Sequence, residues 1–193
     1  QYTLFTTVGG AGQILGMMVI YPLLRNKLSN TAIFKTSLIM AITGYMCLLL
    51  SCITNLAHVL PLLCAIGLLV FVSNGMLSVL TTVFLSSSVD YGEMKTGRRE
   101  ESVIFSMQTF VVKAASGLAV FMTGIGLDWI HLNGNSEDGI PVAQSASTIT
   151  GLRCLMTILP SIGLLVALVV FQKKFQLTDT KAEEIAKALS EIK

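Results

Sequence analysis

The chain has 193 residues, of which 53% are hydrophobic and only 12% are charged. Soluble domains carry about 25% charged residues, so this composition and the mean hydropathy of +0.74 exclude an ordinary soluble protein and indicate an integral membrane protein. The formal net charge of +2 does not indicate nucleic-acid binding. The four cysteines lie in apolar runs without metal-ligand or disulfide spacing, and we interpret them as small buried hydrophobic residues.

Five hydrophobic segments are separated by polar breaks, and each is long enough to cross a hydrocarbon core, which needs about 20 helical residues. Continuous apolar runs favour helices, because a membrane strand would alternate with a period of two. The sequence therefore predicts an all-α, polytopic transmembrane helix bundle in residues 1–172 and a cytoplasmic amphipathic tail in residues 173–193. The expected spans are 2–24, 33–54, 58–88, 103–131 and 148–172.

Basic residues are distributed unevenly among the polar breaks. The breaks after the first, third and fifth spans contain lysine or arginine, whereas the breaks at 55–57 and 132–147 contain neither. By the positive-inside tendency, the basic breaks are cytoplasmic and the other two are external. We therefore expect a multi-pass protein of the cell inner (plasma) membrane with a cytoplasmic C-terminus. An odd number of spans that starts outside, without an initiator methionine or a targeting element, predicts a C-terminal fragment of a longer polytopic chain.

The first and third spans carry patterns that predict helix contacts. The first contains four glycines between Gly9 and Gly16, which allow a neighbouring helix to approach closely. In the third span, four polar residues fall near one helical face: Asn74, Ser78, Thr81 and Thr82. In lipid, such a polar stripe either hydrogen-bonds to a neighbouring helix or lines a water-filled path, and the sequence leaves both interpretations open.

The stretch from Val89 to Lys113 holds the polar chemistry of the chain. Its first half has seven charges within twelve residues, and its second half is apolar apart from Lys113. If the fourth span begins near Val103, Lys113 lies about 15 Å deep at about 1.5 Å per residue, close to the middle of a core about 30 Å thick. A cation there costs at least about 2.5 kcal/mol on insertion scales, so it should face protein or water. The charged residues are Asp90, Glu93, Lys95, Arg98, Arg99, Glu100 and Glu101.

Polar side chains share the helix face of Lys113 at spacings of three and four residues. Secondary transporters hold their substrates at this depth, so the pattern predicts the wall of a substrate cavity. The alternative is a structural lysine that carbonyl groups or a carboxylate of another helix neutralise. No acidic residue lies mid-span, so no cation-coupling carboxylate can be assigned in this chain. The face consists of Ser106, Thr109, Lys113 and Ser116, flanked by Gln108 and Val112.

A family resemblance is sharpest in residues 89–117, VDYGEMKTGRREESVIFSMQTFVVKAASG. The run DYGE, the basic cluster after it and the pattern QTxVVK occur there in order. This segment resembles the loop between the tenth and eleventh helices, and the eleventh helix itself, of the melibiose-permease-like family, the glycoside-pentoside-hexuronide:cation symporters. The weaker resemblance extends over the whole chain.

The resemblance implies a major-facilitator fold of twelve helices, of which this chain would be helices eight to twelve. It also implies two sets of functional residues. Ser78 stands where the best-studied members carry a cavity-facing aromatic residue, so their sugar preference does not carry over. The implied cavity-lining residues are Gln108, Thr109, Val112 and Lys113, together with Ser78, and the implied cytoplasmic gate consists of Asp90, Tyr91, Gly92, Glu93 and Arg98.

We therefore expect not an enzyme but a secondary active transporter that carries a glycoside, pentoside or hexuronide with Na+ or H+ by alternating access. No catalytic residue, metal site or cofactor is expected. The partners implied are a sugar, membrane lipid and the N-terminal helices of the same protein, which would hold the coupling cation. One alternative is a major-facilitator carrier of a drug or organic anion that pairs with Lys113, and another is a non-transporting membrane assembly subunit.

Overall fold

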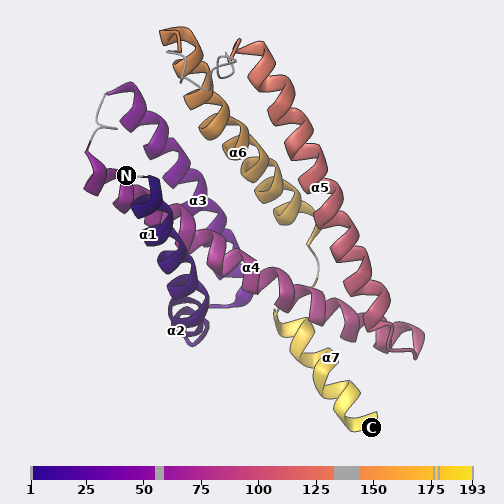
Figure 1. The fold of residues 1–193 in the computed structure, drawn as a ribbon. Coiled ribbons are helices and arrows are strands. Elements are labelled where there is room, and N and C mark those ends of the chain that lie inside the picture. The colour runs from indigo at the N-terminus through magenta and orange to yellow at the C-terminus, as the bar shows by residue number, and fades with distance from the viewer. Residues whose placement is uncertain (1, 55–58, 133–143, 176, 178, 193) are drawn as a thin grey trace.

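The computed structural model describes residues 2–54, 59–132, 144–175, 177 and 179–192 (Figure 1). The predicted break at 55–57 and most of the break at 132–147 lie outside these residues. Within them the chain forms helices and turns and no strand, which confirms the all-α prediction. The elements are α1 (Tyr2–Leu15), the π-helical turn η1 (Gly16–Ile20), α2 (Tyr21–Arg25), α3 (Asn30–Ile53), α4 (Leu60–Thr96), α5 (Glu101–Trp129), α6 (Ala146–Lys174) and α7 (Asp179–Ile192).

Among the described residues, five helices have the length and composition to cross a membrane, as the sequence predicts. The first is the continuous run of α1, η1 and α2, and the others are α3, α4, α5 and α6. α4 has 37 residues and is therefore about 55 Å long, which exceeds a hydrocarbon core of about 30 Å. It continues past the expected end at residue 88, and its last turns carry the charged stretch beyond the apolar part of the helix.

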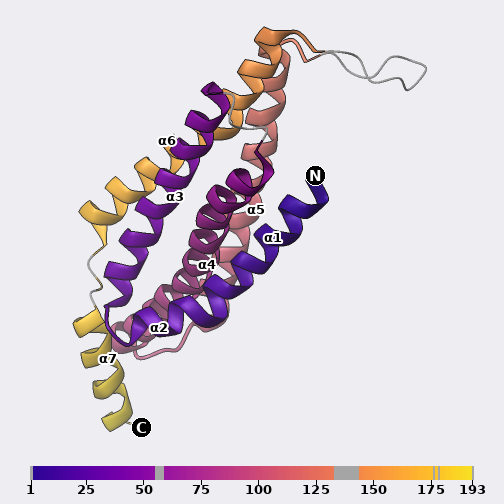
Figure 2. The ribbon, with the colours of Figure 1, turned by 90° about the vertical axis from the view of Figure 1, so that its left-hand side faces the viewer.

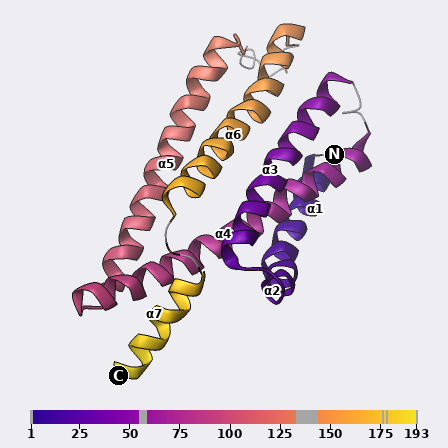
Figure 3. The ribbon, with the colours of Figure 1, turned by 180° about the vertical axis from the view of Figure 1, so that it is seen from behind.

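α4 is the central element of the bundle. It packs against α1 on one side and α3 on the other, and α3 in turn packs against α6 (Figures 1 and 2). A small buried core forms where α3 and α4 meet, from Ile33, Met76 and Leu80, with residues of η1 and α2 packed against it. α5 lies beside α6, away from α1 and α3 (Figure 3).

Glycines bring the backbones of the first span and α4 into direct contact. A Cβ atom on Gly16 would lie 2.6 Å from the carbonyl oxygen of Val72, and one on Gly75 would collide with the carbonyl oxygen of Gln13. Side chains of ordinary size would separate the two helices. This is the close approach that the glycines of the first span predict, and its partner is α4.

Polar contacts attach α7 to the start of α3, close to the core residue Ile33. The carboxylate of Asp179 accepts hydrogen bonds from the backbone N–H groups of Asn30 and Thr31, each at 3.1 Å, and from the Thr31 hydroxyl at 3.1 Å. The first N–H groups of a helix have no partner within it, so Asp179 caps α3 from another element. Glu183 adds an exposed ion pair with Arg25 at 3.8 Å, a kind of contact that contributes little.

An arginine closes the other end of α3. Nη1 of Arg153, on α6, donates to the carbonyl oxygen of Cys52 at 3.3 Å. The last carbonyls of a helix lack partners, and a cation there interacts favourably with the helix dipole. α3 is thus held at its start by an acid of α7 and near its end by a base of α6.

We predict that Gly16→Ala destabilises the protein, whereas Gly10→Ala does not. The added methyl group at Gly16 meets the backbone of Val72, while a Cβ on Gly10 has no atom within 4 Å. Overpacking of this kind costs about 1–3 kcal/mol, so the apparent melting temperature of the purified Gly16→Ala protein in detergent should fall by several degrees. Equal melting temperatures for the two variants would contradict the proposed contact.

Candidate functional site

α5, which carries most of the predicted cavity-lining residues, is the least covered of the membrane helices. The structure describes all 29 of its residues, and none of them is buried. α5 meets α4 at the hairpin that joins them and α6 near the opposite end, where Gly126 packs against Leu155 (Figure 3). There the Thr148 hydroxyl also donates to the carbonyl oxygen of Ile130 at 3.0 Å. Between these two contacts the helix is open.

Lys113 lies in the middle of this open stretch. It follows the first residue of α5 by twelve positions, or about 18 Å along the helix, so it falls near the middle of this 29-residue helix. Its side chain is exposed and makes no hydrogen bond or ion pair with the residues that the structure describes. A lysine at this depth cannot lie against lipid without a large cost. The site therefore needs water, a ligand or further protein beside Lys113.

The hydroxyl groups near Lys113 are satisfied within α5. Ser106 donates to Val103 O at 2.8 Å, and Thr109 donates to Phe105 O at 3.0 Å. Ser116 donates to Val112 O at 2.8 Å. Because their protons are engaged, the oxygen atoms of these groups can accept further hydrogen bonds from a ligand that carries hydroxyl groups. Gln108 is half-buried, and Val112 is exposed.

The polar stripe of α4 divides into two parts. Asn74 is half-buried on α4, which packs against α3, so this end of the stripe fits a contact between two helices. Ser78 and Thr81 are exposed and donate to the carbonyl oxygens four residues earlier, at 2.9 and 2.8 Å. The end of the stripe at Asn74 therefore fits a contact with a neighbouring helix. The exposed end, which includes Ser78, fits the wall of a water-filled path.

A compact charge network occupies the hairpin between α4 and α5. Nη1 of Arg99 binds Asp90 at 3.0 Å and Glu93 at 2.8 Å, and its Nε binds Glu101 at 3.2 Å. These three carboxylates hold the pKa of the Arg99 guanidinium above its usual value. Gly97, with φ of +69°, ends α4 in the left-handed conformation and turns the chain back toward its last turns.

The predicted gate residues have different surroundings in this hairpin. Asp90 and Glu93 are joined through Arg99, Gly92 is half-buried, and Tyr91 is exposed. The guanidinium of Arg98 takes part in none of the ion pairs among the described residues. The sequence shows two adjacent arginines, and only the turn at Gly97 determines which of them reaches back to α4.

The structure does not join the two predicted sets of residues. Both lie on the α4–α5 hairpin, but the length of helix from Glu101 to Lys113 separates the charge network from the mid-span lysine. No hydrogen bond or ion pair within the described residues links Ser78 to the predicted positions on α5. The candidate site is therefore one wall of a cavity rather than a closed pocket.

The family model described as "MFS/sugar transport protein" matches residues 1–179. The chain belongs to this family. Its transporter character agrees with the five membrane-spanning helices and with the mid-span polar face of α5. The family resemblance seen in the sequence is thereby confirmed, while the numbering of the helices as eight to twelve stays a prediction.

The names of curated proteins similar to this chain describe symporters, permeases and importers. The chain is 26% identical over its full length to the inner membrane symporter YicJ of Escherichia coli, of which it covers 40%. It is 30% identical to a lactose permease of Lactobacillus delbrueckii over 62% of this chain and 18% of that protein. It is 37% identical to a putative sulfoquinovose importer of Escherichia coli over 47% of this chain and 18% of that protein. The chain thus spans less than half the length of these relatives.

We predict that Arg99→Gln loosens the α4–α5 hairpin, whereas Arg98→Gln leaves it unchanged. Both variants remove one positive charge, but only Arg99 joins three carboxylates. Exposed ion pairs are individually weak, so amide hydrogen exchange of residues 90–101 should rise about two- to five-fold in Arg99→Gln. High salt should reduce the difference between Arg99→Gln and the unaltered protein. Equal exchange in the two variants would show that the network has no structural role.

Proposed function

We propose that this chain forms the C-terminal part of a secondary active transporter that carries a sugar together with Na+ or H+. The family description and the names of the relatives support transport of a sugar or sugar derivative. The observation that carries the proposal is Lys113, an uncompensated cation near the middle of a membrane helix whose faces are open. The function requires no bond to be made or broken.

Lys113 and its neighbours suit a sugar ligand. An ammonium group donates three hydrogen bonds, and hydroxyl and amide oxygens beside it accept them. A sugar hydroxyl can do both, so it can bridge Lys113 and the acceptors of Thr109 or Gln108. The polar face recurs along one side of α5, which fits a cavity wall better than a single interhelical hydrogen bond.

In this proposal, the open faces of α5 lie against helices outside this chain. The relatives are more than twice as long as the part matched here, and the helices would be eight to twelve of a twelve-helix fold. The N-terminal helices would supply the coupling-cation site, because the described spans carry no mid-span carboxylate. In this proposal, the positive-inside tendency of the basic breaks supports α7 and the α4–α5 hairpin on the cytoplasmic side of the inner membrane.

The hairpin network suits a gate in this mechanism. Alternating access needs contacts that form in one state and break in the other. Arg99 holds Asp90 and Glu93 within the hairpin, and an approaching basic group from the N-terminal half could compete for the same carboxylates. Such exchange of ion-pair partners would couple the position of α4 to closure of the cavity on the cytoplasmic side.

A second candidate function is transport of an anionic sugar. One relative is named a putative sulfoquinovose importer, and an uncompensated lysine is the natural partner of a negatively charged substrate group. This candidate uses the same wall of the cavity and differs in what Lys113 binds. By contrast, no observation favours a non-transporting assembly subunit.

We expect vesicles that contain the intact protein to accumulate a labelled glycoside, pentoside, hexuronide or sulfonated sugar only under an imposed Na+ or H+ gradient. Uptake in each gradient, compared with uptake in ionophore-treated vesicles, identifies the coupling ion. If none of the four substrate classes showed gradient-dependent uptake, this result would contradict the proposal. Accumulation of the sulfonated sugar alone would favour the anionic candidate.

We predict that Lys113→Ala abolishes coupled uptake or lowers substrate affinity about ten- to hundred-fold, because a hydrogen bond to a charged group is lost. Lys113→Arg keeps the charge and should retain partial binding. Lys27→Ala removes an equal charge from the exposed turn before α3 and should transport normally. Membrane levels of all three proteins are measured by immunoblotting. Normal uptake by Lys113→Ala would make Lys113 a structural residue.

A further inference from the structure

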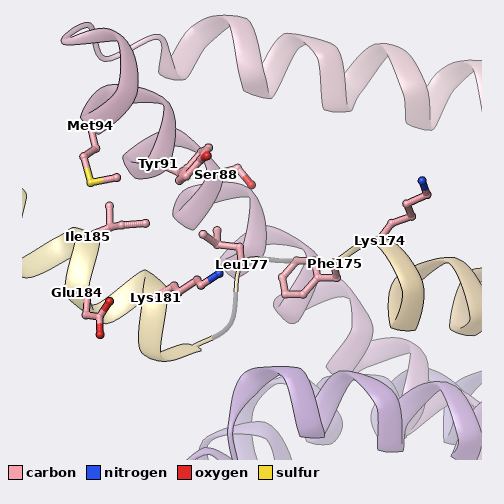
Figure 4. Close-up of a pocket in the computed structure, with 9 residues that line it drawn as sticks. All are labelled: Ser88, Tyr91, Met94, Lys174, Phe175, Leu177, Lys181, Glu184 and Ile185. Carbon is pink, nitrogen blue, oxygen red and sulfur yellow. The ribbon is translucent and has the colours of Figure 1, made fainter.

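A groove of about 580 Å³ lies between the end of α4 and the start of α7. The C-terminal end of α6 closes one side of it, so the groove begins where this membrane span ends (Figure 4). The last turns of α4 form one wall, and α7 forms the wall opposite. Its lining residues are Ser88, Tyr91, Met94, Lys174, Phe175, Leu177, Lys181, Glu184 and Ile185.

The polar lining of this groove is basic and uncompensated. Lys174 and Lys181 line it with a single acid, Glu184, and neither lysine takes part in an ion pair among the described residues. The Tyr91 hydroxyl has no hydrogen-bond partner among these residues either, so it can donate to a ligand. The Ser88 hydroxyl donates to Phe84 O at 2.8 Å and is left as an acceptor. The groove therefore offers donors and positive charge to an anion.

The rest of the lining is apolar. Met94 extends from α4, Ile185 from α7, and Phe175 and Leu177 from the segment between α6 and α7 (Figure 4). Phe175 also stacks on Phe171, with ring centroids 4.5 Å apart, so the apolar wall continues into the membrane part of α6. A soluble anion would use the lysines and leave this wall exposed to water. A ligand with an anionic head and a hydrocarbon tail would use both.

We infer that this groove binds an acidic phospholipid of the adjacent leaflet. Its phosphate lies near the ammonium group of Lys181 and accepts a hydrogen bond from Tyr91, and an acyl chain follows the apolar wall along α6. Lys174, whose ammonium group points away from α7 (Figure 4), adds positive charge at the membrane end of the groove. Basic pockets at the ends of membrane helices attract anionic headgroups, and each basic residue contributes to the attraction. Because α4 and α7 form opposite walls, the bound lipid strengthens the attachment of α7 that Asp179 provides at its other side.

The test measures lipid binding directly and does not depend on transport. The intact protein in detergent is titrated with short-chain phosphatidylglycerol, and the bound lipid is quantified by native mass spectrometry. Parallel titrations use short-chain phosphatidylcholine and inorganic phosphate. We expect saturable binding of phosphatidylglycerol, much weaker binding of phosphatidylcholine, and no displacement of phosphatidylglycerol by phosphate at equal concentration. Equal binding of the two lipids, or displacement by phosphate, would overturn the inference.

A matched pair of double variants locates the site. Lys174→Gln with Lys181→Gln should weaken phosphatidylglycerol binding about twenty- to thirty-fold, since each lysine near an anionic surface is worth about a five-fold change. Lys95→Gln with Lys173→Gln removes the same charge from the ends of α4 and α6, at positions that do not line the groove, and should leave binding within about three-fold. Lys181→Arg keeps the charge and should retain binding. Equal weakening in both double variants would show only nonspecific attraction and would refute the site.

Discussion

The backbone contact between the first span and α4 is the constraint on which the rest of the bundle depends. In a membrane the lipid tails are as apolar as the side chains, so helices associate through close packing rather than through hydrophobic burial. Gly16 lets the first span rest on the backbone of Val72, and Gly75 lets α4 rest on that of Gln13. This contact and the packing of α3 on the other side set the position of α4, which in turn carries Ser78 and the charged hairpin.

The contrast between α4 and α5 explains where a substrate could bind. Among the residues that the structure describes, α4 has neighbours on two sides, whereas α5 is held at its ends and its middle is open. A helix that is open at the depth of Lys113 exposes a cation to whatever lies beside it, and lipid is the least favourable neighbour. The same lack of cover that makes α5 weakly attached in this chain makes it suitable as one wall of a transport cavity.

Charged contacts gather at the end of the bundle that carries α7. The α2–α3 turn, α7 and the α4–α5 hairpin meet this end from different parts of the chain (Figure 2). Asp179 joins α7 to α3, and Arg99 joins the two helices of the hairpin, while the groove of Lys174 and Lys181 lies between α7 and α4. Hydrogen bonds and ion pairs thus join the elements at this end, whereas close backbone packing joins the helices in the interior of the bundle.

The all-α class, the five spans and the family could be predicted from the sequence, because hydrophobic length, helical period and the 89–117 motif are local properties of the chain. Contacts between residues that are distant in sequence became visible in the three-dimensional structure. The sequence could not show that Gly16 packs against the backbone of α4 or that Asp179 caps α3. Nor could it show that Arg99, and not Arg98, binds Asp90 and Glu93. These contacts depend on how the helices cross and on where the chain turns. The spacing of residues along one helix determines neither the crossings nor the turns.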